Sequence, residues 1–347
     1  MHPFVRLILF PILFPLSILY RILFFLDRLR TGKKKLPQAF VISVGNFSVG
    51  GTGKTPFILH LAKLLTMNFP DFPIVVLSRG YGSSGSGTRR VSVDSEANEV
   101  GDEPLLIKKN LPFAEVFVGR SRYESYFEFR KALRIPENRK VFVLLDDGFQ
   151  HHALERDMDI VLIDSTRLDK KDFVLPLGLL RESFGSVKRA DIVVASKFEE
   201  KFERSLERWV SKYKPKKILR FYFVPEALHP IVASKIVLSP GSLKNKSVFA
   251  FCGLGNPEPF WSSLGKLNLA EFECKAFADH KDYSPEDIIR ILELAKGKEY
   301  IVCTEKDAVK LVELIPASES QRWFYLKLAT KLEEESVLLE SVHALIR

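Results

Sequence analysis

The stretch SVGNFSVGGTGKTP, residues 43–56, decides the fold because it contains most of a phosphate-binding loop. The usual pattern is G-x-x-x-x-G-K-[ST], and Gly53, Lys54 and Thr55 supply its end. The first glycine of the pattern would fall at residue 48, where this chain has serine. An apolar run precedes the loop and a helical pattern follows it, which is the context that such a loop requires. The sequence therefore predicts a nucleotide-phosphate site in preference to a glycine-rich turn that binds nothing.

The residues of this loop have separate roles in phosphate binding. The glycines allow a tight path on which backbone N–H groups point at the anion, at the N-terminus of a helix. The Lys54 ammonium reaches the terminal phosphates, and the Thr55 hydroxyl is a ligand for Mg²⁺. A small residue can replace the first glycine at the mouth of the loop. The predicted nucleotide-binding residues are Ser48, Val49, Gly50, Gly51, Thr52, Gly53, Lys54 and Thr55.

A second motif, VFVLLDD at residues 141–147, is an apolar run that ends in two acids. In phosphate-loop proteins a carboxylate at this position holds Mg²⁺. A second adjacent carboxylate is more than packing requires. We therefore predict that Asp146 and Asp147 govern a metal ion, the alternative being a strand end with solvated acids.

Short apolar runs alternate with helical patterns along the first two thirds of the chain. Such runs are typical of a parallel sheet that is covered on both faces, with ligands beyond the carboxyl ends of its strands. A charged, proline-containing stretch at residues 199–217 indicates a domain boundary, and a second α/β pattern follows it. We predict a kinase-like phosphate-loop core at 36–217 and a smaller α/β lid domain at 218–347. The strands of the core are predicted within 39–46, 72–82, 114–119, 139–147, 158–165 and 190–198.

The N-terminus is apolar and is followed by basic residues. Its longest uncharged run, Leu7–Tyr20, contains Pro11 and Pro15 and is shorter than the roughly 20 residues of a spanning helix. The sequence DRLRTGKKK comes next, with no signal-peptidase pattern. We predict that residues 1–35 form a helix at the membrane interface, with the basic residues against anionic head groups. The alternative is a helix packed on the protein's own core.

The composition restricts the partners. The formal net charge of +9 favours an anionic partner, and with no zinc-finger or RNP-type motif we expect anionic lipid or a phosphorylated substrate, not nucleic acid. The three cysteines are widely spaced with no C-x-x-C, which indicates reduced thiols in a cytoplasmic protein. No protein partner is inferred.

Several polar residues remain ambiguous from the residues alone. Asp102, in GDEP, could be a helix N-cap or a functional acid. Arg79 and Arg122 could bind phosphate or form surface ion pairs. His280 follows a predicted strand, and a lone histidine is more often structural.

The motifs GNFSVGGTGKTP, SRGYG, GDEP, LLDDGFQHH, LPLGLLRES, DH before Y-x-x-x-D, and TEKDAVKL occur in this order. Together they resemble the tetraacyldisaccharide 4'-kinase family of lipid A biosynthesis, over nearly the whole chain. The resemblance implies transfer of the γ-phosphate of ATP, with Mg²⁺, to the 4'-hydroxyl of a tetraacylated disaccharide 1-phosphate, which gives the lipid A precursor. It also implies a helix at the cytoplasmic face of the inner membrane, with the protein peripheral or monotopic. The family's loop commonly lacks the first glycine.

The resemblance further implies residue roles. Asp102 would be the base that takes the sugar hydroxyl proton, His280 its partner, and Lys54 the third catalytic group. The loop LPLGLLRES departs from the family's LPAGPLREP at Leu177, Leu179 and Ser183. The implied metal-binding residues are Thr55, Asp146, Asp147 and Glu182, and the implied substrate-binding residues are Arg79, Tyr81, Arg122 and Arg181.

A membrane-associated GTPase switch is the alternative function. The sequence VVASKFE, residues 193–199, approximates the guanine-reading pattern N/T-K-x-D, with Ser196 for Asn and Glu199 for Asp. No D-x-x-G follows the acidic strand, which disfavours this alternative.

Overall fold

A computed structural model of the chain describes residues 3–80, 87–170, 173–232, 236–278 and 281–347. The chain forms two compact units, one from Met1–Phe221 with Leu332–Arg347 and the other from Tyr222–Lys331. The sequence placed the boundary after residue 217 and assigned residues 332–347 to the smaller domain. In the structure this C-terminal segment clusters with the first unit.

The first unit is built on a parallel sheet with the strand order β8-β7-β6-β1-β5-β2-β4-β3, in which only the short β3 is antiparallel to its neighbour. The predicted α/β fold with a parallel sheet is thereby confirmed. The strands are β1 Ala39–Asn46, β2 Ile74–Ser78, β3 Arg89–Arg90, β4 Glu115–Val118, β5 Val141–Asp146, β6 Met158–Asp164, β7 Ile192–Ser196 and the start of β8 Ile218–Pro230.

Helices cover both faces of this sheet, which explains why its strands are continuous apolar runs. Successive side chains of a strand point to opposite faces. Val143 of β5 packs in a core cluster with Phe129, whereas Phe142 contacts Phe69 at the end of α2. The helices are α2 Lys54–Asn68, α3 Ala97–Val100, α4 Asp102–Asn110, α5 Arg122–Ala132, α6 Glu203–Tyr213 and α10 Glu335–Ile346.

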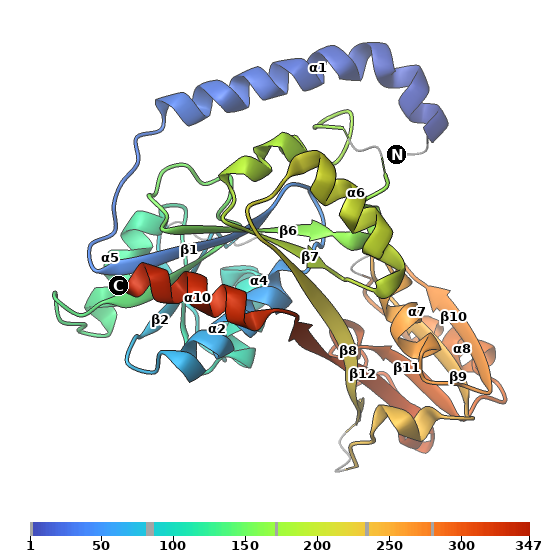
Figure 1. Cartoon of the computed structure of the whole chain (residues 1–347). Coiled ribbons are helices and arrows are strands. Elements are labelled where there is room, and N and C mark those ends of the chain that lie inside the picture. The colour runs from blue at the N-terminus through green and yellow to red at the C-terminus, as the bar shows by residue number, and fades with distance from the viewer. Residues whose placement is uncertain (1–2, 81–86, 171–172, 233–235, 279–280) are drawn as a thin grey trace. The chain divides into compact units, whose positions relative to one another are not determined.

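Helix α10 lies beside α2, the helix that follows the phosphate loop (Figure 1). His60 of α2 contacts Glu335 of α10 at 2.9 Å, and the rings of Phe69 and His343 are 4.8 Å apart. These contacts explain why the C-terminal segment belongs to the first unit.

Helix α1 spans Pro3–Arg30 and continues through Pro11 and Pro15. By length and composition alone, Leu9–Arg30 could cross a membrane, and only 6% of its most apolar window is buried. Most of its described apolar side chains are exposed, so they do not pack on the protein's own core. This finding disfavours the alternative of a core helix.

The second unit contains the strand order β10-β9-β11-β12-β8. Its core clusters lie on both sides of β9 and β11, with Phe251 in one and Ala250 in the other. Its other strands and α-helices are β9 Ser247–Cys252, α7 Glu258–Gly265, β10 Glu271–Ala276, α8 Pro285–Leu294, β11 Tyr300–Thr304, α9 Glu305–Ala308 and β12 Trp323–Leu332.

Candidate active site

The phosphate loop connects the end of β1 to the start of α2. Gly50 and Gly53 have φ of 111° and 83°, a region in which a side chain would be strained. A Cβ added at Gly50 or Gly51 would meet no atom within 4 Å, so these two glycines border open space. Ser48 is not among the positive-φ residues of the described chain, which explains why glycine is not required there.

Polar side chains at the carboxyl ends of β1 and β7 form hydrogen bonds to this loop. Asn46 Nδ2 donates to Thr52 Oγ1 at 2.8 Å and to the Ser48 carbonyl at 2.7 Å. From the end of β7, Ser196 Oγ donates to the Thr52 carbonyl at 2.7 Å. Lys197 Nζ donates to the Gly51 carbonyl at 2.6 Å. The sequence did not single out Asn46, although a polar residue at the end of an apolar strand is a usable signal.

A folded-back segment without regular strands, residues 173–182, also contacts the loop, and we call it the 173–182 hairpin for brevity. The Val49 N–H donates to the Leu179 carbonyl at 2.8 Å, and the Arg181 N–H donates to the Phe47 carbonyl at 2.7 Å. These contacts involve backbone atoms only. Leu179, which stands where the family has proline, therefore leaves them intact. A Cβ at Gly178 would lie 2.1 Å from the Phe173 carbonyl oxygen, so only glycine fits that turn.

Asp146 ends β5 and is 2% exposed. Its Oδ2 accepts a hydrogen bond from Ser78 Oγ at 2.8 Å, while its Oδ1 has no hydrogen-bond partner within the described chain. Burial raises the pKa of this carboxyl, against the hydrogen bond from Ser78 and the charge of Lys54. A buried carboxylate oxygen that points at no donor fits a cation ligand beside the loop.

Asp147, the next residue, contacts two cations. Its Oδ1 lies 3.6 Å from Lys54 Nζ, and its Oδ2 accepts from Arg181 Nη1 at 2.6 Å. Burial alone would raise the pKa of Asp147, but the charges of Lys54 and Arg181 lower it below its ordinary value. The structure thus brings together Lys54, Asp147 and Arg181, which the sequence had assigned to three different roles.

Glu182 is placed differently from the other predicted metal ligands. Both of its carboxylate oxygens accept from Arg189 Nη2, at 2.8 and 2.6 Å, and Gln150 also donates to it. Within the described ranges there is no group of three or more His, Cys, Asp or Glu residues able to hold a metal. Mg²⁺ needs no such group, because it keeps several waters and takes phosphate oxygens alongside one or two protein ligands. Thr55 and Asp146 fit that description.

Arg122, predicted to contact the acceptor, is only 2% exposed. Its guanidinium donates to the Asp146 carbonyl, and burial lowers its pKa to about 10. In this conformation it supports the end of β5 from within the core. Arg79 is exposed at the end of β2, and Tyr81 lies outside the described residues.

Asp102 is the first residue of α4 and is exposed. Gly101 occupies the N-cap position, so Asp102 is not the cap that the sequence left open. Glu103 beside it was not singled out from the sequence. Desolvation raises its pKa, and the nearby charge of Asp146 adds to the effect. His280 lies outside the described residues.

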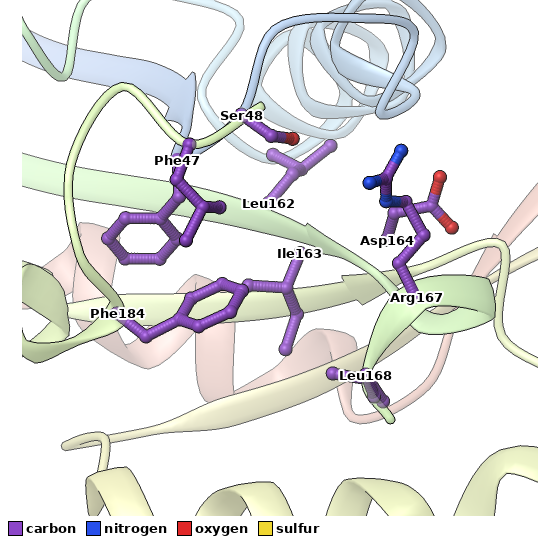
Figure 2. A pocket seen from close by; sticks show the side chains of 9 residues that line it. Phe47, Ser48, Leu162, Ile163, Asp164, Arg167, Leu168 and Phe184 are labelled. Atoms are coloured by element: carbon purple, nitrogen blue, oxygen red, sulfur yellow. The ribbon is translucent and has the colours of Figure 1, made fainter. Parts of the chain in front are cut away.

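A small pocket adjoins the loop next to Ser48 (Figure 2). Its floor is apolar, and the rings of Phe47 and Phe184 meet edge to face with their centres 5.5 Å apart. Asp164 and Arg167 provide its polar side, and Asp164 also accepts from Lys197 at 2.8 Å. The other lining residues are Leu162, Ile163, Leu168 and Leu180.

A parallel sheet whose first strand leads through a glycine loop into a helix, with a lysine and an acidic strand end facing that loop, defines a phosphate-loop nucleotide-binding protein. The family model of tetraacyldisaccharide-1-P 4'-kinase matches residues 9–347. The chain therefore belongs to the tetraacyldisaccharide-1-P 4'-kinase family and is a kinase.

Relatives and one solved structure agree with this family. A tetraacyldisaccharide 4'-kinase of Syntrophobacter fumaroxidans is 36% identical over 85% of this chain and 78% of its own length. The one of Methylobacillus flagellatus is 35% identical over 93% and 88%. The crystal structure of LpxK from Aquifex aeolicus in complex with ATP has a TM-score of 0.71 at 32% identity, and the match covers 99% of this chain and 100% of that one. The predicted family and kinase activity are confirmed, and the GTPase alternative is not supported.

Proposed function

We propose that this kinase transfers the γ-phosphate of ATP to the 4'-hydroxyl of a tetraacyldisaccharide 1-phosphate, which yields the lipid A precursor. The observation that carries the proposal is the open glycine loop, with Lys54 at the start of α2 lying 3.6 Å from Asp147, the residue after β5. The ATP complex of the Aquifex aeolicus protein, which matches along the whole chain, supports ATP as the donor.

The protein binds the triphosphate mainly with fixed dipoles and charges. Backbone N–H groups of residues 50–55 and the N-terminus of α2 surround the phosphates. Lys54 stabilises the charge on the transferring group, which is where a preorganised cation contributes most to phosphoryl transfer. The contacts from Asn46, Ser196 and the 173–182 hairpin keep the loop in shape before the nucleotide arrives.

The bound nucleotide would carry Mg²⁺, held by Thr55 and Asp146. This ion would neutralise negative charge on the phosphate oxygens. Asp147 keeps Lys54 and Arg181 close to the site through its two carboxylate oxygens. Because phosphate oxygens compete for both cations, the binding of nucleotide would loosen this pair of contacts and direct the cations to the phosphates.

For the acceptor, Asp102 is the proposed base, with His280 as its partner. Asp102 is exposed at the start of α4, where its carboxylate is available to a sugar hydroxyl. A carboxylate is a weak base, and an imidazole partner can orient it and shift its pKa. The proposal for His280 rests on the family resemblance, and a kinetic test of the pair follows in the Discussion.

The acceptor is a lipid, and α1 gives the kinase a surface on which to meet it. The exposed apolar side chains of α1 and the basic residues after it fit the interface of an anionic membrane. We place the protein at the cytoplasmic face of the inner membrane, peripheral or monotopic.

Donor preference tests the proposed chemistry. The full chain, mixed with tetraacyldisaccharide 1-phosphate in detergent micelles with Mg²⁺, should transfer radiolabelled phosphate from ATP to the lipid. Transfer from GTP should be much slower. Hydrolysis of nucleotide without any labelled lipid would contradict the assignment of the acceptor.

A further inference from the structure

Ser17 is the single buried residue among the described side chains of α1. It is 6% exposed, whereas the adjacent Leu16 and Ile18 are 45% and 44% exposed. Its hydroxyl donates to the Val174 carbonyl at 3.0 Å, across 157 residues of sequence. A hydroxyl in an apolar helix is costly to bury unless it is hydrogen-bonded, and here it is bonded to the 173–182 hairpin.

Two further residues of α1 face the same region of the protein. The rings of Phe24 and His152 lie edge to face at 5.7 Å, and Tyr20 is within electrostatic reach of Arg181 and Glu182. Ser17, Tyr20 and Phe24 are three and four residues apart, which places them on one face of a helix. One face of helix α1 thus contacts the rest of the first unit, and the other apolar side chains of the helix remain exposed.

Val174 contacts two other residues of the 173–182 hairpin. It forms a bridge with Leu180, and its carbonyl accepts from the Gly178 N–H at 3.1 Å as well as from Ser17. A carbonyl oxygen has two lone pairs and can accept both bonds. Ser17 is therefore hydrogen-bonded to the same carbonyl group that accepts from Gly178 in the turn of the hairpin.

The hairpin in turn contacts the phosphate loop on both sides of Ser48. Leu179 accepts from the Val49 N–H, Arg181 donates to the Phe47 carbonyl, and the Arg181 side chain contacts Asp147. The 173–182 hairpin is therefore hydrogen-bonded to α1 at Val174 and to the phosphate loop at Leu179 and Arg181. A shift of α1 along its axis would move the Val174 carbonyl or break its bond to Ser17.

We propose that Ser17 is a positioning residue that fixes the membrane helix to the 173–182 hairpin, so that binding of α1 to a phospholipid surface holds Arg181 and the phosphate loop in their productive geometry. The proposal rests on the proposed function of that loop. It assigns to α1 a second role besides attachment. Turnover would depend on the contact between α1 and the 173–182 hairpin.

The test uses the full-length protein bound to vesicles of phosphatidylethanolamine and phosphatidylglycerol that contain the lipid acceptor. Ser17→Ala should lower kcat of the vesicle-bound enzyme by about two- to tenfold, the ratio that corresponds to one hydrogen bond. The fraction bound to vesicles should stay unchanged, because alanine is apolar. Ser17→Thr, which keeps the hydroxyl, should restore kcat.

Ile18→Ala is the matched control, since Ile18 is the exposed neighbour of Ser17. It should weaken vesicle binding while leaving kcat of the bound enzyme unchanged. Normal kcat in Ser17→Ala, or an equal loss in Ser17→Thr, would overturn the proposal. Failure of the wild-type enzyme to phosphorylate the acceptor would instead contradict the proposed function, so the two failures are distinguishable.

Discussion

Lys54 Nζ lies 3.6 Å from Asp147 Oδ1, and Arg181 lies 2.6 Å from the other oxygen of the same carboxylate. One acid therefore holds two cations, from the phosphate loop and from the 173–182 hairpin, beside the space that the glycines leave open. Asp146, its neighbour in sequence, is buried and contacts Ser78 instead. The two adjacent acids thus have opposite pKa shifts, and we expect different consequences when each is changed.

Asp146→Asn should abolish turnover without destabilising the nucleotide-free protein. The folded-state pKa of Asp146 is raised by burial, so at neutral pH its ionised form lowers the stability of the fold, and neutral asparagine removes that cost. The Ser78 hydrogen bond can persist. Thermal unfolding would show a Tm equal to or above that of the wild type without ligand. The increase in Tm on adding Mg-ATP should be smaller in the variant, and a large loss of Tm without ligand would contradict this account.

Nucleotide binding should depend on pH through the same carboxyl. A raised pKa means that Asp146 takes up a proton at a higher pH than the ordinary 3.8, so Mg-ATP affinity should fall as the solution becomes acidic. Asp147, whose pKa is lowered, should stay ionised over that range. Calorimetry in two acidic buffers of different ionisation enthalpy should detect proton release on binding. Equal proton release from Asp146→Asn would assign the proton to another group.

Deleting residues 1–30 should raise the soluble fraction and impair activity on the long-chain acceptor. The deletion removes the exposed apolar surface of α1 and the hydrogen bond from Ser17. Binding of a fluorescent nucleotide should persist, because the phosphate loop and β5 are retained. If the truncated protein remains equally bound to membranes, its attachment lies elsewhere.

Asp102 and His280 should behave as one kinetic unit. Asp102→Ala and His280→Ala should each lower the single-turnover rate strongly, and the double variant should be little slower than the slower single variant. Nucleotide affinity should hardly change in any of them. Fully additive losses would show independent roles, and a normal rate for His280→Ala would make His280 a structural residue.

The parallel sheet and the phosphate loop could be predicted because their signals are local in sequence. Buried strands appear as unbroken apolar runs, and the loop needs its glycines within a few residues of Lys54. The family could be predicted from the order of its motifs. Even Ser48 is explained by the structure, since its backbone does not need positive φ.

The pairing of side chains could not be predicted, because it joins residues that are distant in sequence. Nothing near Glu182 indicates that it binds Arg189, nor does the pattern around Arg122 show that its guanidinium is buried under Asp146. The return of residues 332–347 to the first unit depends on contacts such as His60 with Glu335. Ser17 belongs to no motif, and only its burial distinguishes it.

The most direct test of the central claim is to identify the phosphorylated product made by the wild-type enzyme and by Lys54→Ala. With ATP, Mg²⁺ and tetraacyldisaccharide 1-phosphate, mass spectrometry and phosphorus NMR should show a second phosphate at the 4' position. Lys54→Ala should reduce this turnover on the order of 10²-fold or more, because it removes a cation from the transition state. Lys63→Ala, on the exposed side of the same helix, should leave it unchanged. A product phosphorylated elsewhere, or near-normal turnover in Lys54→Ala, would contradict the account.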